Sequence, residues 1–359
     1  MAINLITEYS TLLDKRFTQK SLTEAFCGHD YSWDGENSIK VFTIDPVTIQ
    51  DYNTTGTNRF SGGNAPTNLG DEVNTYTLAK KRGFSTILEG TQGQDQKNIK
   101  KANAVLKQIW DEQMVPEIDK YRLQTWANGA GHTVINSTAL TKSTIIEQIL
   151  KAQAHLNNKL VNRDGRVCFI TETMAVQTKL ASELSYNPAY TSKAIVNGEV
   201  ARLGGLPIVA IPDDWMPTGI EFMVKYKRAS TDPTKLKMLR VLSHVQGIYG
   251  DVLEGLTRYD SFVLANKADG IYVYGTGSIL PEPTITVASG TATMSSTNAT
   301  TIYYTTDGSN PKTSSTRAAY NGSSKPGSLT EGTVIKAYGE ASGYTSSGIA
   351  THVVTGSED

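Results

Sequence analysis

The sequence predicts an α+β body over residues 1–277, followed by an all-β sandwich over residues 281–359. The composition changes near 275–283: Ser and Thr supply 29 of the 79 residues from Pro281 onward, and only 10 of these residues are charged. The body mixes helix and strand patterns without a repeating strand–helix–strand unit, which indicates the α+β class. The tail repeats short β-branched runs separated by Gly, Asn and Pro, a pattern typical of an antiparallel sandwich.

Length and charge narrow the class of protein. A chain of 359 residues is long enough for two or three domains with real cores. Its net charge is −1, which gives no general electrostatic reason to bind nucleic acid or a membrane. The N-terminal stretch MAINLITEYSTLLDKRF carries charges where a signal peptide is apolar, and no apolar run approaches the roughly 18 residues of a membrane span. We therefore expect folding in the cytoplasm.

The first 88 residues predict an arm with little interior of its own. Residues 1–38 carry a short helical pattern and a polar loop. Residues 38–88 read as two extended arms around a tip rich in Gly and Asn, with strands in SIKVFTI, VTIQDY and NTYTLAKKRGFSTIL. Because this hairpin holds few large apolar side chains, it cannot be stable alone. Another part of the chain, or another copy, must cover it.

A long helix is predicted over residues 95–128. Ile99, Leu106 and Trp110 recur at helical spacing and form one apolar face. Pro116 should kink or break the helix, because proline removes a backbone hydrogen bond and clashes with the preceding turn. The span is about 50 Å at 1.5 Å per residue, which is long for a compact domain.

The remainder of the body alternates between strands and shorter helices. Helices are expected over residues 143–160 and in MAVQTKLASE. Gly and Pro punctuate the expected strands, which are RVCFITE, LGGLPIVAIPDDWM, GIEFMVKYKRAS, LKMLRVLSHVQGIYG and DSFVLANKADGIYVYG.

No motif indicates catalysis, and we predict no catalytic, metal or cofactor site and no enzyme. G-x-S-x-G, P-loop and G-x-G-x-x-G motifs are absent. Asp213 and Asp214 form the best acidic pair, but adjacent carboxylates in a turn more often cap or solvate a loop than share a proton. Glu117 and Asp119 lie two positions apart on a helix and do not face each other. The five histidines lie outside any metal-binding motif: His29, His132, His155, His244 and His352.

Three other groups of residues have more than one interpretation. Cys27 and Cys168 lack metal-ligand spacing and are expected to be buried free thiols. The basic run at 80–82 is either a solvated edge or a contact with an acidic patch on a neighbouring subunit. Tryptophans can stack on ligands, but they more often anchor cores or interfaces; they are Trp33, Trp110, Trp126 and Trp215.

The order of these parts resembles the major capsid protein of tailed bacteriophages, which has the Hong Kong 97-type fold. The motifs VPEIDKYRLQTWA, LGGLPIVAIPDDWM and ANKADGIYVYG carry the resemblance, in the expected order and spacing. It covers residues 1–277. The resemblance implies an N-terminal arm at 1–38, an E-loop at 39–88, a spine helix at 95–128, and peripheral and axial domains at 129–277, with the axial domain at about 173–262.

The tail resembles the small immunoglobulin- or fibronectin-like module at the C-terminus of chitobiases and many bacterial surface enzymes. TIYYTTDGSNPKTSSTRAAYNG carries the match, with TVIKAYGEASGYTSSGIATHVV downstream. The resemblance implies an immunoglobulin-like domain at 281–359, displayed on the outer surface of a capsid. Its role is open between weak glycan or bacterial-surface contact and a spacer or stabilising function. Most of its tyrosines are expected in its core.

The resemblance implies a capsid protein that self-assembles into the icosahedral head shell enclosing viral DNA. Its partners would be identical copies in hexamers and pentamers, a separate scaffolding protein, a portal, and DNA held on the inner face without sequence specificity. No membrane would be involved. The protein would be assembled in the host bacterial cytoplasm and end in the virion.

Two alternatives stay open at this stage. A phage tail-tube protein could carry the same module, although a tube subunit would not need the long helix. A carbohydrate-active enzyme could also carry it, because the module often follows glycosidase domains. A glycosidase needs two carboxylates across a cleft, and the body shows no barrel-like repeat to place them.

Overall fold

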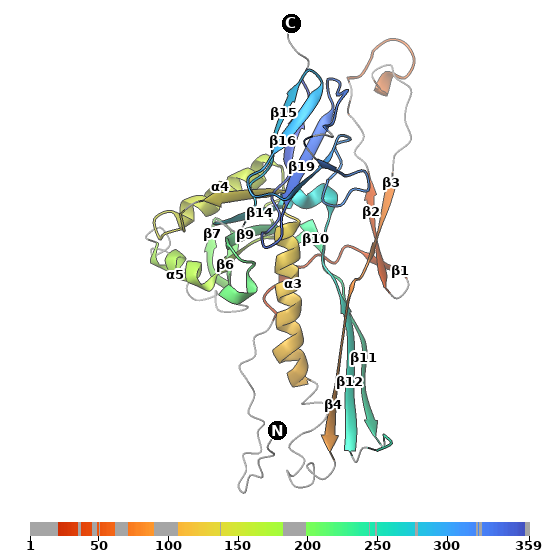
Figure 1. Cartoon of the computed structure of the whole chain (residues 1–359), viewed down its shortest axis with the longest axis vertical. Helices are drawn as coiled ribbons and strands as arrows, with labels where there is room; N and C mark the ends of the chain where they lie inside the picture. Colours follow the sequence, from red (N-terminus) through yellow and green to blue (C-terminus); the bar gives the residue numbers. More distant parts are fainter. Residues whose placement is uncertain are drawn as a thin grey trace.

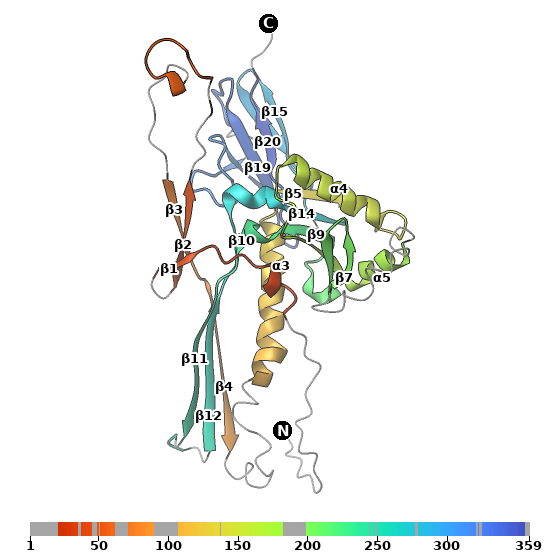
Figure 2. The same ribbon diagram turned by 180° about the vertical axis from the view of Figure 1, so that it is seen from behind.

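The structure is a computed structural model of an elongated α+β body with a β-sandwich at one end (Figures 1 and 2). The predicted fold class is confirmed. The structure describes residues 21–34, 37–44, 49, 51–61, 71–89, 107–136, 138–181, 199–243, 245–247, 250–276, 279–320, 322 and 325–355.

A mixed six-stranded sheet forms the centre of the body. Its strand order is β5-β14-β9-β6-β8-β7, with β14/β5 and β6/β8 parallel and the other pairs antiparallel. Helix α3 packs on one face, and α4 and α5 pack on the other. The bounds are β5 (His132–Asn136), β6 (Arg166–Thr171), β7 (Glu199–Leu203), β8 (Leu206–Ile211), β9 (Ile220–Tyr226), β14 (Ile271–Thr276), α3 (Val115–Asn128), α4 (Ile145–Asn158) and α5 (Glu172–Leu180).

Strand β6 shows how the sheet divides two hydrophobic cores. Phe169 faces α3, where its ring stacks on Trp126 with centroids 5.7 Å apart. Cys168 and Ile170 face the other way, into the core that includes Ile149 of α4. Alternate side chains of a strand point to opposite faces, so a strand covered on both sides is apolar throughout. This accounts for the continuous run VCFI.

The long predicted helix is described from residue 107 onward, and residues 95–106 lie outside the described residues. A π-helical segment, η3 (Trp110–Met114), leads directly into α3, and Val115 keeps helical angles of φ −61° and ψ −50°. The helix therefore does not break at Pro116. The disturbance expected there takes the form of one π turn, which places the proline in the first turn of α3, where its missing N–H is tolerated.

A second, three-stranded antiparallel sheet runs beside α3 toward the end of the molecule opposite the sandwich (Figure 1). It consists of β4 (Lys80–Glu89), β12 (Gly250–Tyr259) and β11 (Thr234–Ser243). Strand β4 pairs with β12 over its whole length. Residues 80–88, which we expected in the E-loop, thus belong to this sheet. Strands β11 and β12, expected in the axial domain, belong to it as well.

The remaining arm is an antiparallel ribbon of β2 (Ser38–Ile44) and β3 (Asp71–Thr77), with β1 (Ser32–Asp34) added at the edge of β2. The predicted strand VTIQDY is wrong where it is described, because Ile49 and residues 51–53 have no strand structure. The short elements are β10 (Ser230–Thr231), β13 (Phe262–Val263), η1 (Glu24–Phe26), η2 (Arg59–Ser61), η5 (Asp213–Trp215), η6 (Lys227–Ala229) and η7 (Ala265–Gly270).

The C-terminal module is a sandwich of two sheets. One holds β15 (Thr284–Ala288) and β16 (Thr291–Ser295); the other has the order β18 (Ala318–Tyr320), β17 (Thr301–Thr305), β19 (Val334–Glu340), β20 (Ala350–Val353). The short β-branched runs that predicted strands form β15, β16, β17, β19 and β20, and β18 was missed. Tyr304 and Tyr320 pack on the module core, while Tyr344 is 39% exposed. Gly308 has a φ of +75°, as expected for the Asp-Gly turn.

The segment that begins at Ser21 is fixed to α3 by one buried carboxylate. Asp119 accepts hydrogen bonds from Ser21 Oγ at 2.8 Å, from Leu22 N at 2.9 Å and from Thr23 Oγ1 at 2.6 Å. One turn further along, Arg122 Nη1 donates to Glu24 at 2.6 Å. A carboxylate that accepts three hydrogen bonds from one short segment fixes the path of that segment across the helix.

Asp119→Ala should destabilise the body by about 3 kcal/mol, because it leaves buried donors without an acceptor. Urea unfolding followed by circular dichroism measures this loss. Asp111→Ala on the same helix is the control and should change stability by less than about 0.5 kcal/mol. Equal stabilities of the two variants would contradict the anchoring role of Asp119.

Candidate functional site

The structure offers two candidate functional features: the outward face of the β2–β3 ribbon and the junction between the C-terminal module and the body. Among the described residues, no group of three or more His, Cys, Asp or Glu side chains could hold a metal ion. Within the same residues, no helix has the length and apolar character needed to cross a membrane.

The outward face of the ribbon carries large apolar side chains that the single chain leaves open. Phe42 of β2 and Val73 of β3 are cross-strand partners, and they are 67% and 43% exposed. Ile39 lies on the other face and is fully buried. At the tip, the Phe60 ring packs edge-on against Tyr52 at 5.1 Å but is still 90% exposed. The face opposite Ile39 thus carries one exposed apolar cross-strand pair, Phe42 and Val73, beyond the polar pair Lys40 and Thr75.

The base of the ribbon is held by the same chain. The Tyr76 ring lies 4.9 Å from the ring of Phe262. Where β3 turns into β4, the N–H of Ala79 donates to Asp260 Oδ2 at 2.7 Å. The other oxygen of Asp260 accepts from the hydroxyl of Tyr121 on α3, also at 2.7 Å. The expected cover for the arm therefore comes from its own chain at the base, while Phe42, Val73 and Phe60 stay exposed among the described residues further out.

Two side chains of the basic run at 80–82 contact helix α3, and one of them, Arg82, has an acidic partner there. Arg82 Nε lies 2.6 Å from Glu117 Oε1 on α3, and the Tyr259 hydroxyl donates to the same oxygen at 2.7 Å. Burial alone would raise the pKa of Glu117, but the hydrogen bonds from Tyr259 and Arg82 lower it. Lys80 Nζ lies 5.0 Å from the centre of the Tyr121 ring. Arg82 therefore has an acidic partner within its own chain, and the contact with a neighbouring subunit stays a prediction.

At the junction, Lys312 of the module binds the C-terminal end of α3. Its Nζ donates to the carbonyl oxygens of Asn128 at 2.5 Å and of Ala130 at 2.9 Å. The last carbonyls of a helix lack intrahelical partners and carry partial negative charge, so a lysine amine suits them. The side chain is only half-buried, but its amine end is enclosed, and this burial lowers the pKa of Lys312 to about 7.

The module also covers the open edge of the six-stranded sheet at β5. Glu282 Oε1 accepts from the N–H of Thr133 at 3.0 Å and lies 2.8 Å from His132 Nδ1. The N–H of Ile349 donates to the carbonyl of Gly131 at 3.1 Å. Edge strands present unpaired backbone groups, which native proteins pair or cover. The module therefore caps the start of the β5 edge and is not attached by a tether alone.

Two histidines that sequence patterns did not connect meet beneath this junction. The rings of His132 and His155 stack with centroids 4.0 Å apart and planes 12° apart. Burial and the neighbouring His132 both lower the pKa of His155, whose Nε2 is buried without a hydrogen-bond partner. Tyr272 packs against both rings. The two histidines therefore form a stacked pair between β5 and α4.

The structure also places the other residues singled out by sequence. Asp213 accepts from Thr173 N at 3.2 Å and from Thr173 Oγ1 at 2.5 Å, which confirms a capping role at the start of α5. Glu117 and Asp119 bind different parts of the chain, as their spacing predicted. Cys27 and Cys168 are buried free thiols, as expected, and burial raises the pKa of each.

The tryptophans take different positions. Trp126 is fully buried in the core, whereas Trp33 is 40% exposed under Lys235 Nζ, which lies 4.7 Å from the ring centre. Sequence reasoning missed Lys312 and Glu282, because their partners lie 184 and 149 positions away in the chain. No local motif marks such pairs.

The fold is similar to solved phage structures. A chain of Mycobacterium phage Che8 aligns at 16% identity and a TM-score of 0.56, covering 76% of this chain and 98% of that chain. The capsid structure of the Cyanophage P-SCSP1u aligns at 12% identity and 0.60, covering 76% and 93%. The head structure of Helicobacter pylori bacteriophage KHP40 aligns at 11% and 0.55, covering 76% and 94%. The body therefore has the Hong Kong 97-type fold that the sequence predicted.

The tail matches the family described as Chitobiase/beta-hexosaminidase C-terminal domain over residues 281–351. This confirms the resemblance read from the motif around Tyr303. A sequence search of curated proteins found no match.

Gly348→Ala should weaken the junction. A Cβ at Gly348 would lie 2.3 Å from Glu282 Oε1 and 2.7 Å from Thr133 N, so the module would have to move off β5. We expect a loss of about 1–3 kcal/mol, measured as a lower melting temperature by calorimetry. The control is Gly327→Ala, whose Cβ would lie 3.9 Å from its nearest neighbour, Thr291 Oγ1. Identical melting temperatures would contradict tight docking.

Lys312 should make the stability of the protein depend on pH. Its pKa is about 7 when folded and near 10.5 when unfolded, so between these values unfolding takes up a proton. Stability should therefore rise with pH across this range by up to about 1.4 kcal/mol per unit, relative to Lys312→Met. Urea unfolding at pH 7.5 and 9.5 tests this, with Lys325→Met as the exposed control. Parallel profiles for the wild type and Lys312→Met would show that the amine is not buried.

Proposed function

We propose that this chain is a major capsid protein that self-assembles into the icosahedral head shell of a tailed phage. The observation that carries the proposal is the distal ribbon, where Phe42, Val73 and Phe60 leave large apolar surface open in a single copy. Exposed apolar patches mark interaction sites. A symmetric shell supplies every copy with an identical neighbour to cover this patch. The fold likeness to phage capsid structures supports the same role.

In this proposal, the copies join in hexamers and pentamers. Each contact is weak, and closure of the shell makes the set of contacts stable. The base of the ribbon, fixed through Ala79 and Asp260, sets the direction in which the ribbon reaches a neighbour. A rigid base and an open distal face are the properties that such an arm needs.

The two alternative classes have less support. A tail-tube subunit would not need the helix α3. This helix packs against both the three-stranded sheet of β4, β12 and β11 and the central sheet, and its C-terminal end binds the module. A carbohydrate-active enzyme would need paired carboxylates across a cleft. The acidic residues at the centre of this fold, Glu117, Asp119 and Asp260, accept hydrogen bonds from neighbouring segments and so serve as structural anchors. We therefore assign a structural role without enzymatic activity.

We further propose that the module at 281–359 lies on the outer surface of the shell. In Figures 1 and 2 it sits at the same end of the molecule as the ribbon tip, while β11 and β12 reach the opposite end. Its bonds to α3 and β5 favour a stabilising role over a freely hinged glycan-binding one.

We propose domain bounds that differ from the expected E-loop at 39–88 and axial domain at 173–262, because β4 pairs with β12. In this proposal the E-loop is 38–78. The peripheral domain would contain α3 with β4, β11 and β12, and the axial domain would contain α4 and α5, with the pairings of β4 and of β2–β3 as support. A separate scaffolding protein, a portal and DNA on the inner face complete the proposed assembly in the host cytoplasm. The mature protein would reside in the virion.

Replacing the outward ribbon pair tests the proposal. The double variant Phe42→Ser/Val73→Ser should keep the melting temperature of the subunit within about 2 °C, because both side chains are exposed, yet should reduce shell formation at least tenfold. Electron microscopy of the purified protein counts the shells. Val353→Ser, an equally exposed apolar position on the module, is the control and should assemble normally. Tubes or compact monomers from the wild type would overturn the capsid assignment.

A further inference from the structure

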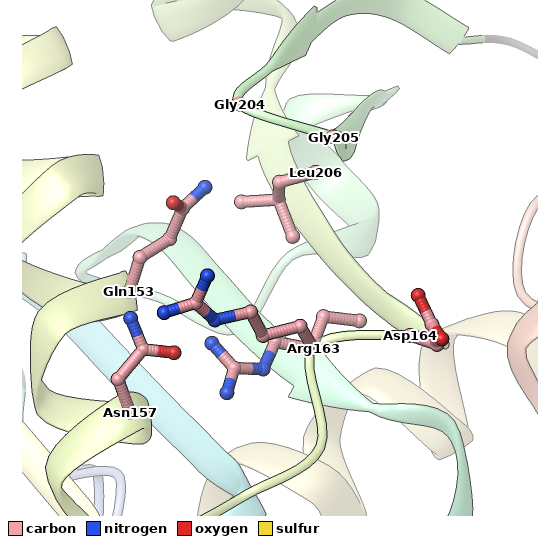
Figure 3. A pocket seen from close by; sticks show the side chains of 8 residues that line it. Gln153, Asn157, Arg163, Asp164, Gly204, Gly205 and Leu206 are labelled. Carbon is pink, nitrogen blue, oxygen red and sulfur yellow. The ribbon is translucent and has the colours of Figure 1, made fainter.

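A cavity of about 350 Å³ lies between the C-terminal end of α4 and the turn joining β7 to β8, away from both features described above. Figure 3 shows the side chains that line it. Polar and charged side chains dominate this lining, which consists of Gln153, Asn157, Arg163, Asp164, Arg166, Gly204, Gly205 and Leu206.

Arg166 brings a buried positive charge to the cavity wall. Its side chain is only 5% exposed. Its Nε donates to the carbonyl of Asn162 at 2.8 Å, and one terminal nitrogen donates to the carbonyl of Val161. Among the described residues, no carboxylate forms an ion pair with it. Burial and the neighbouring charge of Arg163 both lower the pKa of Arg166, so its surroundings disfavour the positive charge that it carries. A buried charge without a counter-charge is costly, and an anion would relieve that cost.

Arg163 adds a second guanidinium at the mouth of the cavity. Figure 3 shows this group extended toward Gln153 and Asn157, with the carboxylate of Asp164 turned away from it. The Gln153 amide is fixed by donating to the carbonyl of Leu203 at 3.1 Å. Asn157 Oδ1 is buried without a hydrogen-bond partner. This oxygen can accept from a protonated phosphate oxygen, and turning the amide over would present its N–H₂ donors to the cavity instead.

We propose that this cavity is a binding site for an oxyanion, a carboxylate or phosphate group held by Arg163 and Arg166. Two guanidinium groups offer the paired N–H donors that match such oxygens. The oxyanion has two sources: a free phosphate ion, or a carboxylate side chain of a neighbouring copy in the assembly. The second source rests on the proposed function, and the first does not.

The first arm of the test uses unassembled full-length protein and inorganic phosphate. Melting temperature is measured against phosphate at constant ionic strength, with chloride as the reference. Free phosphate as the ligand predicts a saturable rise in the wild type and an at least tenfold weaker apparent affinity in Arg163→Gln. Lys142→Gln, an exposed cation at the other end of α4, should bind phosphate as the wild type does. Arg163 is itself exposed, so its replacement should leave the fold intact.

The second arm measures the protein concentration at which shells form. A neighbouring carboxylate as the ligand predicts that Arg163→Gln raises this concentration at least fivefold over Lys142→Gln, with or without phosphate binding to the free subunit. If Arg163→Gln matches Lys142→Gln in both arms, the site is overturned. If the wild type forms no shells at all, the capsid proposal fails, and the phosphate arm alone decides the site.

Discussion

Helix α3 is the element on which the other parts of the structure depend. One side chain of the helix, Glu117, binds β4 and β12; another, Asp119, binds the segment at residues 21–23; and Trp126 enters the core of the central sheet. Its last carbonyls bind Lys312 of the module. Because these bonds leave one rigid rod, the helix helps to set how these parts are oriented relative to one another. A long helix that seemed excessive for a compact domain is explained by this role.

The groups packed around α3 find partners within the chain, whereas apolar side chains of the distal ribbon do not. The carboxylates of Glu117, Asp119 and Asp260 all have donors within the chain, and the edge of β5 is covered by the module. The distal ribbon is different, since apolar side chains there face solvent. A subunit whose described carboxylates are paired and whose ribbon exposes apolar side chains is suited to self-association. The proposed function therefore depends on this exposed surface and on the fixed base of the ribbon.

The sequence predicted the parts with a strong local period or motif. The apolar run in β6 and the helical spacing around Trp110 identified their elements, and the motif around Tyr303 identified the module. It could not predict that β4 pairs with β12, since alternation fixes which side chains share a face but not which strand lies beside them. The bonds of Lys312 were missed for a related reason, because they join segments 184 positions apart in the chain.

The candidate surfaces were foreseen in part. The lack of apolar residues in the arm pointed to intersubunit contact, but the sequence did not show that the base of the arm is held within the chain through Asp260. The oxyanion cavity left no sequence signal, since Gln153, Arg163 and Gly204 come from a helix, a loop and a strand turn. Sites assembled from such separate elements are visible only once the fold brings them together.

A near-atomic reconstruction of the wild-type particle by electron cryomicroscopy tests the central claim most directly. The account predicts an icosahedral shell in which the side chain of Phe42 contacts an adjacent copy and is removed from solvent. A shell in which Phe42 stays exposed, or a ribbon folded back onto its own chain, would contradict it.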